Sequence, residues 1–237
     1  MQRSFGPWRH LFRARVALLV AAATAVAGCV VPGLPGGGDG LDTAPAAERI
    51  AAIANEAAPD VGNWEELPDC PFSPGGAVLT TAAAELDSLS ADAALSAELF
   101  AGVDFFSFAQ PPLLACDRFD DVSNSSLGVF ASQAPDDMET YIREFLTTRD
   151  GDDEGEVTPF DYSLSGEHRG GRFHRICVNE PADDNVYCEV DWVDDHVLIG
   201  FYVGGDGSQD IDMAAMEDGL ARVLDDVLAG LAADTAG

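Results

Sequence analysis

The sequence predicts an α+β domain in which helices pack on one face of an antiparallel sheet of about five strands. Three observations support this fold class. Residues 172–203 alternate apolar and polar side chains around two turn signals, as a three-stranded meander does. A shorter alternating pair lies at 113–132, and residues 209–231 carry apolar side chains at the three- and four-residue spacing of a core-facing helix.

Composition and charge limit the classes of function. The chain has 237 residues, and 47% of them are hydrophobic, which is enough to build a core. Its 12 basic residues are all arginine and oppose 42 acidic residues, so the formal net charge is −30. A charge of this sign opposes binding to nucleic acid or to an anionic membrane surface, and both partners are therefore excluded.

Residues 1–28 have the layout of an export signal. Four arginines and no acid lie in residues 1–15, and Val16–Ala27 is an apolar run that ends in small residues. As a helix, Val16–Val31 would reach only about 24 Å, short of a ~30 Å hydrocarbon core. We therefore expect a cleaved signal peptide; a plain secreted protein and an uncleaved anchor are the alternatives.

The signal ends in Val-Ala-Gly-Cys at residues 26–29, which resembles the bacterial lipobox. The resemblance implies that Cys29 receives a diacylglyceryl group, that the chain is cut after Gly28, and that the new terminus is acylated. Two or three acyl chains hold a protein almost permanently, since each buried methylene contributes about 0.8 kcal/mol. We expect a lipoprotein on the outer face of the cell membrane, with a charge of −34 because cleavage removes four arginines and no acid.

The exported chain divides into a tether and one domain. Residues 29–45 combine the lipidated cysteine with a flexible segment rich in Gly and Pro, and 46–237 form a single α+β extracytoplasmic domain. The first predicted helix is Ala46–Ala58, which Pro59 ends, and the second runs from Ala77 to about Leu99. The segment Gly62–Gly76 between them is predicted to be irregular.

Strands and helices alternate in the rest of the domain. Two strands, Leu113–Phe119 and Ser126–Ser132, flank a turn-rich segment, and a helix over Pro135–Arg149 follows. The meander Arg172–Val203 comes next, and Gln209–Leu231 is the closing helix.

The meander has the most specific register. A turn centred on residues 182–183 places Cys177 opposite Cys188 and Phe173 opposite Trp192. One face is then apolar, while the other, with His174, Glu189 and Asp191, is expected to be wetter. A second turn at 194–195 pairs three residues of the last strand with three of the middle one: Val197 with Trp192, Ile199 with Val190, and Phe201 with Cys188.

The cysteines predict two disulfides. With Cys29 assigned to lipid, four cysteines remain in an exported chain, and three connectivities are open. The hairpin register selects Cys177 with Cys188, which leaves Cys70 with Cys116. A metal site of cysteines and histidines is the alternative, although CxxC spacing is absent.

These features together resemble a known group of proteins. A lipobox, a Gly/Pro tether, a cysteine before an Ala-rich helix, a second cysteine entering a strand and a later hairpin pair before a C-terminal helix are similar in layout to small secreted lipoproteins of actinobacteria. The layout is also similar to the two-disulfide extracellular sensor domain of actinobacterial membrane kinases. The resemblance covers residues 60–231 in pattern; it implies an envelope location and ligand sensing, and it carries over no catalytic residue.

A basic cluster is a candidate anion site. Arg169, Arg172 and Arg175 are three of the exported chain's eight arginines, and His174 and two glycines lie among them. Such a cluster with free backbone amides can hold an anion. The alternative is that these arginines neutralise the acidic loop that precedes them, with Arg175 at the rim of the core.

The segment 150–161 is a candidate calcium loop. Acids stand at its positions 1, 3, 5 and 12, a glycine at 6 and an aliphatic residue at 8, a layout similar to an EF-hand loop. The candidate ligands are Asp150, Asp152, Glu154, Glu156 and Asp161. An ordinary solvated acidic loop is the alternative; a site here would be a weak one, and no other cofactor is expected.

The motifs that carry catalysis are absent from the sequence. There is no GxSxG elbow, no Gly-rich phosphate loop and no HExxH helix. We therefore predict a binding or sensor-like module without enzyme activity, whose partner is a small ligand or another envelope protein. The alternatives are an envelope hydrolase that uses paired carboxylates and a structural or adhesive surface lipoprotein.

Overall fold

The computed structural model describes residues 41–57, 65–67, 69–72, 75–84, 86, 99–104, 113–120, 125–142, 160–180, 185–206 and 210–233. The predicted signal peptide, Cys29 and most of the tether lie outside these residues. Among the helices in these ranges, none is both long enough and apolar enough to cross a membrane.

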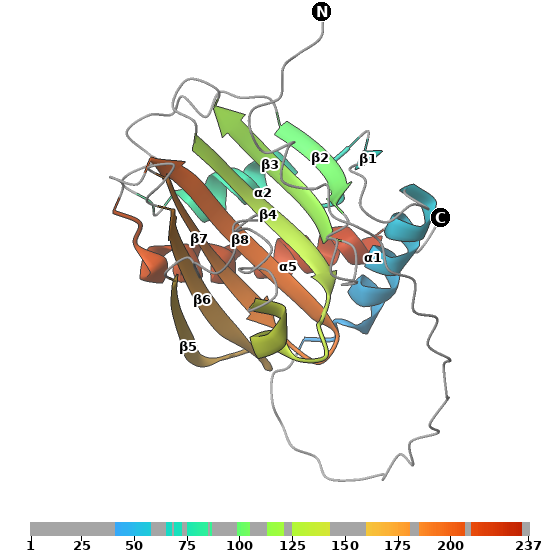
Figure 1. Cartoon of the computed structure of the whole chain (residues 1–237). Helices are drawn as coiled ribbons and strands as arrows, with labels where there is room; N and C mark the ends of the chain where they lie inside the picture. Colours follow the sequence, from blue (N-terminus) through green and yellow to red (C-terminus); the bar gives the residue numbers. More distant parts are fainter. Residues whose placement is uncertain are drawn as a thin grey trace, which may run out of the picture.

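The centre of the molecule is one antiparallel sheet, with the strand order β1-β2-β3-β4-β8-β7-β6-β5 (Figure 1). Because β4 pairs with β8, the first four strands and the last four form one continuous surface. Seven strands make up most of it, since β1 has two residues. The strands are β1 (Glu65–Glu66), β2 (Leu99–Asp104), β3 (Leu113–Asp120), β4 (Ser125–Gln133), β5 (Phe160–His168), β6 (Gly171–Glu180), β7 (Asn185–Val193) and β8 (Val197–Asp206).

Three helices cover one face of this sheet: α1 (Ala44–Ala57), α2 (Gly75–Ala83) and α5 (Met213–Ala233) (Figure 1). The close approach of α2 and α5 requires a glycine, because a Cβ at Gly219 would lie 2.3 Å from the carbonyl oxygen of Ala82. We call this side of the sheet the helix-covered face. Large apolar side chains fill it, among them Trp192, Ile199, Phe201, Met216, Leu220 and Leu224.

Both predicted disulfides are present. Cys177 and Cys188 lie opposite each other on β6 and β7 with their Cα atoms 4.1 Å apart. Cys70 joins the segment before α2 to Cys116 of β3, at a Cα separation of 5.7 Å. The same β6–β7 register pairs Phe173 with Trp192, as the sequence predicts.

The prediction of about five strands is wrong, because β1, β2 and β5 carry weak sequence signals. The sequence of β2, LFAGVD, is apolar without alternation. The edge strand β5 exposes both of its faces at residues 161–164, so it needs no apolar stripe. Its hairpin with β6 turns at Arg169–Gly170, both at positive φ, as a two-residue hairpin turn requires.

The β7–β8 register differs from the predicted one by two residues. The connection is longer than a two-residue turn, since Val193 pairs with Leu198. Asp194 closes it: one of its carboxylate oxygens accepts hydrogen bonds from the backbone N–H groups of His196 (2.8 Å) and Val197 (2.9 Å). A two-residue shift keeps each side chain on its predicted face. The observed pairs are Ile199 with Trp192, Phe201 with Val190, and Val203 with Cys188.

The helix predictions differ mainly at their ends. α1 begins at Ala44, and the predicted second helix is α2 as far as Ala83, while Leu99 already belongs to β2. Of the predicted helix 135–149, residues 138–142 are helical and 143–149 lie outside the described part. Asp137 caps this turn, because its carboxylate accepts hydrogen bonds from the N–H of Glu139 (3.1 Å) and the hydroxyl of Thr140 (2.6 Å).

Candidate functional site

The structure does not bring the predicted anion-binding residues to one point. Successive side chains of β6 alternate, so Arg175 lies on the helix-covered face while Arg172 and His174 lie on the opposite face. Each arginine has an acidic partner: Arg169 pairs with Asp225, Arg172 with Glu167 at 2.8 Å, and Arg175 with Glu217 at 2.7 Å.

Only one of the predicted calcium ligands lies within the described residues. Asp161 is an exposed residue of β5, opposite Cys177. Asp150, Asp152, Glu154 and Glu156 lie outside them. Across the described ranges, no three His, Cys, Asp or Glu side chains are placed to hold a metal ion.

The opposite face of the sheet carries ionisable and aromatic side chains in its interior. Strand register places His174, Asp191 and Gly200 side by side, and Glu189 beside Tyr202 in the next row. The expectation of a wetter face is wrong, since Glu189 is 2% and Asp191 is 0% exposed. We call the following residues the acid–aromatic cluster: Asp117, Phe130, His174, Tyr187, Glu189, Asp191 and Tyr202.

Asp191 is the most unusual member of the acid–aromatic cluster. Neither of its carboxyl oxygens has a hydrogen-bond partner among the described side chains and backbone groups. The space for this carboxyl exists because its neighbour on β8 is Gly200, where a Cβ would lie 2.5 Å from Asp191 Oδ1 and 2.1 Å from the Phe130 ring. The residue is therefore placed against an aromatic ring in the middle of the sheet.

Burial and the neighbouring Glu189 both raise the pKa of Asp191. The two carboxyls stand two residues apart on β7 and so share a face. Burial first, and then the negative charge of Glu189, hold the pKa of Asp191 well above its usual 3.8. Both effects penalise the ionised form, so Asp191 keeps its proton to a higher pH than an ordinary carboxyl does. Glu189 also accepts a 2.7 Å hydrogen bond from the Tyr187 hydroxyl.

Asp117 is a second acid of the cluster, and it is half-buried. Its Oδ2 accepts a 3.0 Å hydrogen bond from the Tyr202 hydroxyl, while its Oδ1 is buried without a partner among the described groups. Burial raises the pKa of Asp117 to about 6, although the Tyr202 hydrogen bond acts in the opposite direction. The Tyr202 ring reaches Asp117 across Gly128, where a Cβ would lie 2.4 Å from the ring.

Aromatic rings connect these acids. Tyr202 stacks on Tyr187 at a centroid distance of 5.6 Å and contacts Phe130 at 6.2 Å. On β6, His174 Nδ1 lies 2.9 Å from the Tyr162 hydroxyl. Burial and then the charge of Arg172 lower the pKa of His174 below 6.5, so this imidazole is neutral at pH 7.

The sequence contained one signal for this burial. β7 and β8 carry apolar side chains on both faces, because Tyr187 and Leu198 alternate with Cys188 and Ile199. A strand that is apolar on both faces is typical of a sheet that is covered on both sides. The helical residues 138–142 lie on this side, where Met138, Tyr141 and Ile142 pack against the apolar part of the face.

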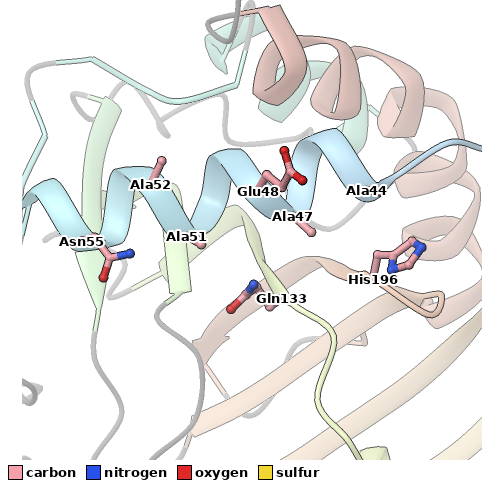
Figure 2. A pocket seen from close by; sticks show the side chains of 8 residues that line it. All are labelled: Ala44, Ala47, Glu48, Ala51, Ala52, Asn55, Gln133 and His196. Atoms are coloured by element: carbon pink, nitrogen blue, oxygen red, sulfur yellow. The ribbon is translucent and has the colours of Figure 1, made fainter. Parts of the chain in front are cut away.

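Two surface hollows lie elsewhere. An open groove of about 540 Å³ runs beside α1, where Gln133 and His196 lie across from a row of α1 residues (Figure 2). Four of its eight lining residues are alanines, and the polar ones, Glu48, Asn55, Gln133 and His196, include one carboxylate. A smaller hollow of about 240 Å³ lies between β5, β6 and α5, and Gly166, Glu167, His168, Phe173, Glu217, Asp218 and Ala221 line it. Neither hollow contains a fully buried charged group.

Comparisons with protein-family models, with curated proteins and with solved structures find no match to this chain. The functional assignment therefore depends on the residues of this chain. Among these residues, the acid–aromatic cluster has the most strongly perturbed ionisable groups.

Proposed function

We propose that this chain is a lipid-anchored extracytoplasmic binding module whose ligand site is the acid–aromatic cluster. One observation carries the proposal: Asp191 is completely buried, and neither of its oxygens has a hydrogen-bond partner among the described residues. An unpaired buried carboxyl costs folding free energy, so it persists where it serves a purpose other than stability.

Two features of the chain support an extracytoplasmic location at the membrane. The lipobox-like sequence at Cys29 supports lipid anchorage, and two disulfides support an oxidising compartment. We expect Cys29→Ser to move the protein from the membrane fraction to the medium. Retention of this variant in membranes would favour an uncleaved helical anchor.

The carboxyl pair also favours a second candidate, an envelope hydrolase. Two neighbouring carboxyls, one of which has a raised pKa, can provide an acid and a base in one site. Glu189 and Asp191 are almost fully covered, so either function requires this face of the sheet to open. Turnover of a glycoside or ester substrate, lost in Glu189→Gln and in Asp191→Asn, would favour the hydrolase.

A ligand screen by thermal shift tests the binding module. The soluble Cys29→Ser chain serves as the parent, and Asp191→Asn retains the shape of the side chain but removes its ability to ionise. The matched control is Asp218→Asn, an exposed carboxylate on α5. We expect at least one cationic, neutral or anionic small molecule to raise the Tm of the parent and of the control but not that of Asp191→Asn. Equal shifts in all three proteins, or no shift with any ligand, would contradict the proposal.

A further inference from the structure

The outer edge of β5 is open in the described part of the molecule. β5 is the last strand of the sheet, and within the described ranges β6 is the only strand beside it (Figure 1). Such an edge presents a row of unpaired backbone N–H and C=O groups, which is a template for another strand. The other end of the sheet is much shorter, because β1 has two residues. β5 is therefore the edge with room for a partner strand.

Strand pairing shows which backbone groups of β5 point outward. Cys177 and Cys188 have Cα atoms 4.1 Å apart, the separation of a pair without mutual hydrogen bonds, so Cys177 directs its N–H and C=O to β5. The two-residue turn between β5 and β6 gives the same phase, because the residues that flank such a turn form a hydrogen-bonded pair. Hydrogen bonding alternates along each strand, so Ser163 bonds to β6 while Tyr162 and Leu164 direct their N–H and C=O away from the sheet.

The same two residues expose large apolar side chains. Tyr162 is 41% and Leu164 is 49% exposed, and no other large hydrophobic side chain is exposed among the described residues. They stand two residues apart and so share the face opposite the helices, where the Tyr162 hydroxyl lies 2.9 Å from His174 Nδ1. A strand added at this edge would satisfy their backbone groups and cover their side chains together.

The two halves of β5 differ in their protection against strand addition. In the second half the register shifts between Leu164 and Glu167, and Arg172 holds the Glu167 side chain. Irregularities and charged side chains of this kind blunt an edge. Residues 160–164 pair with β6 without interruption, and their sequence, FDYSL, contains no proline or lysine. The regular half is thus also the half that exposes apolar side chains, as expected of a docking edge.

The charge of the edge selects the kind of partner. Asp161 is exposed on the side of the helix-covered face, and it has no ion pair with a described residue. Arg172 and Arg175, the arginines of β6, are already paired with carboxylates. Because the whole chain has a formal net charge of −30, a second copy would bring like charges together. Charge complementarity therefore favours a basic strand over a copy of this chain.

We propose that residues 160–164 of β5 bind an extended segment of another protein, in which basic and apolar side chains alternate. The segment adds to the eight-stranded sheet as one more strand. Its backbone bonds to the outward N–H and C=O groups of Tyr162 and Leu164, its apolar side chains cover theirs, and its basic side chains lie on the side of Asp161. This surface goes beyond the proposed ligand site, since it uses the edge of the sheet and not the interior of its face.

Hydrogen exchange followed by NMR tests the proposal on the soluble Cys29→Ser chain. The probe is a short capped peptide of alternating Lys and Val. One control peptide has Glu in place of each Lys, and the other keeps the charge but has Pro in place of the central Val, which prevents strand pairing. We expect the Lys/Val peptide to slow exchange of the Tyr162 and Leu164 amides at least about tenfold, while the Ser163 amide is protected with or without it. Neither control peptide should slow exchange.

Two variants separate backbone pairing from attraction between charges. Leu164→Pro removes an N–H that makes no bond to β6, so the circular dichroism spectrum should be kept while peptide binding is lost. Leu164→Lys retains that N–H but repels a basic strand, and it should weaken binding about tenfold or more. Ser163→Ala, the matched control on the same strand, should bind as the parent does.

Three results would overturn the proposal. The first is unchanged exchange of Tyr162 and Leu164 with the Lys/Val peptide. The second is equal slowing by either control peptide, which would show that charge alone or any strand suffices. The third is protection of both amides in the free protein that increases with protein concentration, which would place a second copy of the chain at this edge.

Discussion

The two faces of the sheet are built from the same strands but differ in chemistry. On β7, Val190 and Trp192 point toward the helices, while Glu189 and Asp191 point to the opposite side, and all four are at most 2% exposed. One face is an apolar core; the other places carboxyls among aromatic rings at an equal depth. Burial alone therefore does not show whether a face of a sheet stabilises the fold, because buried apolar side chains are favourable and buried carboxyls are not.

The helix-covered face should be the more sensitive to truncation. Trp192 is completely buried, and its indole N–H donates a 2.9 Å hydrogen bond to the carbonyl of His168. We expect Trp192→Ala to lower the free energy of unfolding by about 3–5 kcal/mol, through lost burial and the cavity that remains. Urea unfolding followed by circular dichroism measures this loss.

The matched change on the other face is Asp191→Asn, at the next position along β7. It removes an ionisable group that is buried at a cost, so the free energy of unfolding at pH 7 should stay level or rise. A loss as large as that of Trp192→Ala would remove the distinction between the faces.

Stability should depend on pH because of the acids on the opposite face. In the folded state the pKa of Asp117 is raised from 3.8 to about 6, and that of Asp191 is raised well above 3.8. The folded protein thus binds protons more tightly than the unfolded chain, and this contribution is fully present below about pH 4 and is lost as pH rises through the folded pKa values. Asp117 alone accounts for roughly 2 kcal/mol between pH 4 and pH 7.

Unfolding midpoints measured from pH 4 to pH 8 check this dependence. Asp117→Asn should flatten the part of the profile near pH 6, and Asp191→Asn should flatten the part in which the Asp191 carboxyl titrates. A profile that both variants leave unchanged would show that these carboxyls have ordinary pKa values in the folded state.

The smallest effect is expected at the surface of β6. Arg172 and Glu167 form a 2.8 Å ion pair, but their side chains are 54% and 74% exposed. We expect Arg172→Ala to change the free energy of unfolding by less than about 1 kcal/mol at moderate salt. A larger loss in urea unfolding would mean that Arg172 contributes to the acid–aromatic cluster through its effect on His174.

Local sequence patterns predict much of the fold, but they do not predict the candidate site. The β6–β7 register and both disulfides follow from alternation, because one wrong step would move Cys177 and Cys188 to opposite faces. The predicted β7–β8 register differs from the observed one by two residues, because the side chain of Asp194 closes a longer turn. Nothing local indicates that β4 pairs with β8, which places Asp117 and Phe130 on the same face as Asp191. Glu189 and Asp191 look like solvent-facing residues of an amphipathic strand until that pairing is known.

The central claim is that Asp191 retains its proton because it is buried beside Glu189. Carbon-13 NMR of the carboxyl groups during a pH titration measures this directly, and the Asp191→Asn variant assigns the signal. We predict that the Asp191 carboxyl titrates at a pH well above 3.8 and that Glu189→Gln shifts its midpoint, as expected for a coupled pair. A midpoint close to 3.8 that is unchanged in Glu189→Gln would contradict the account.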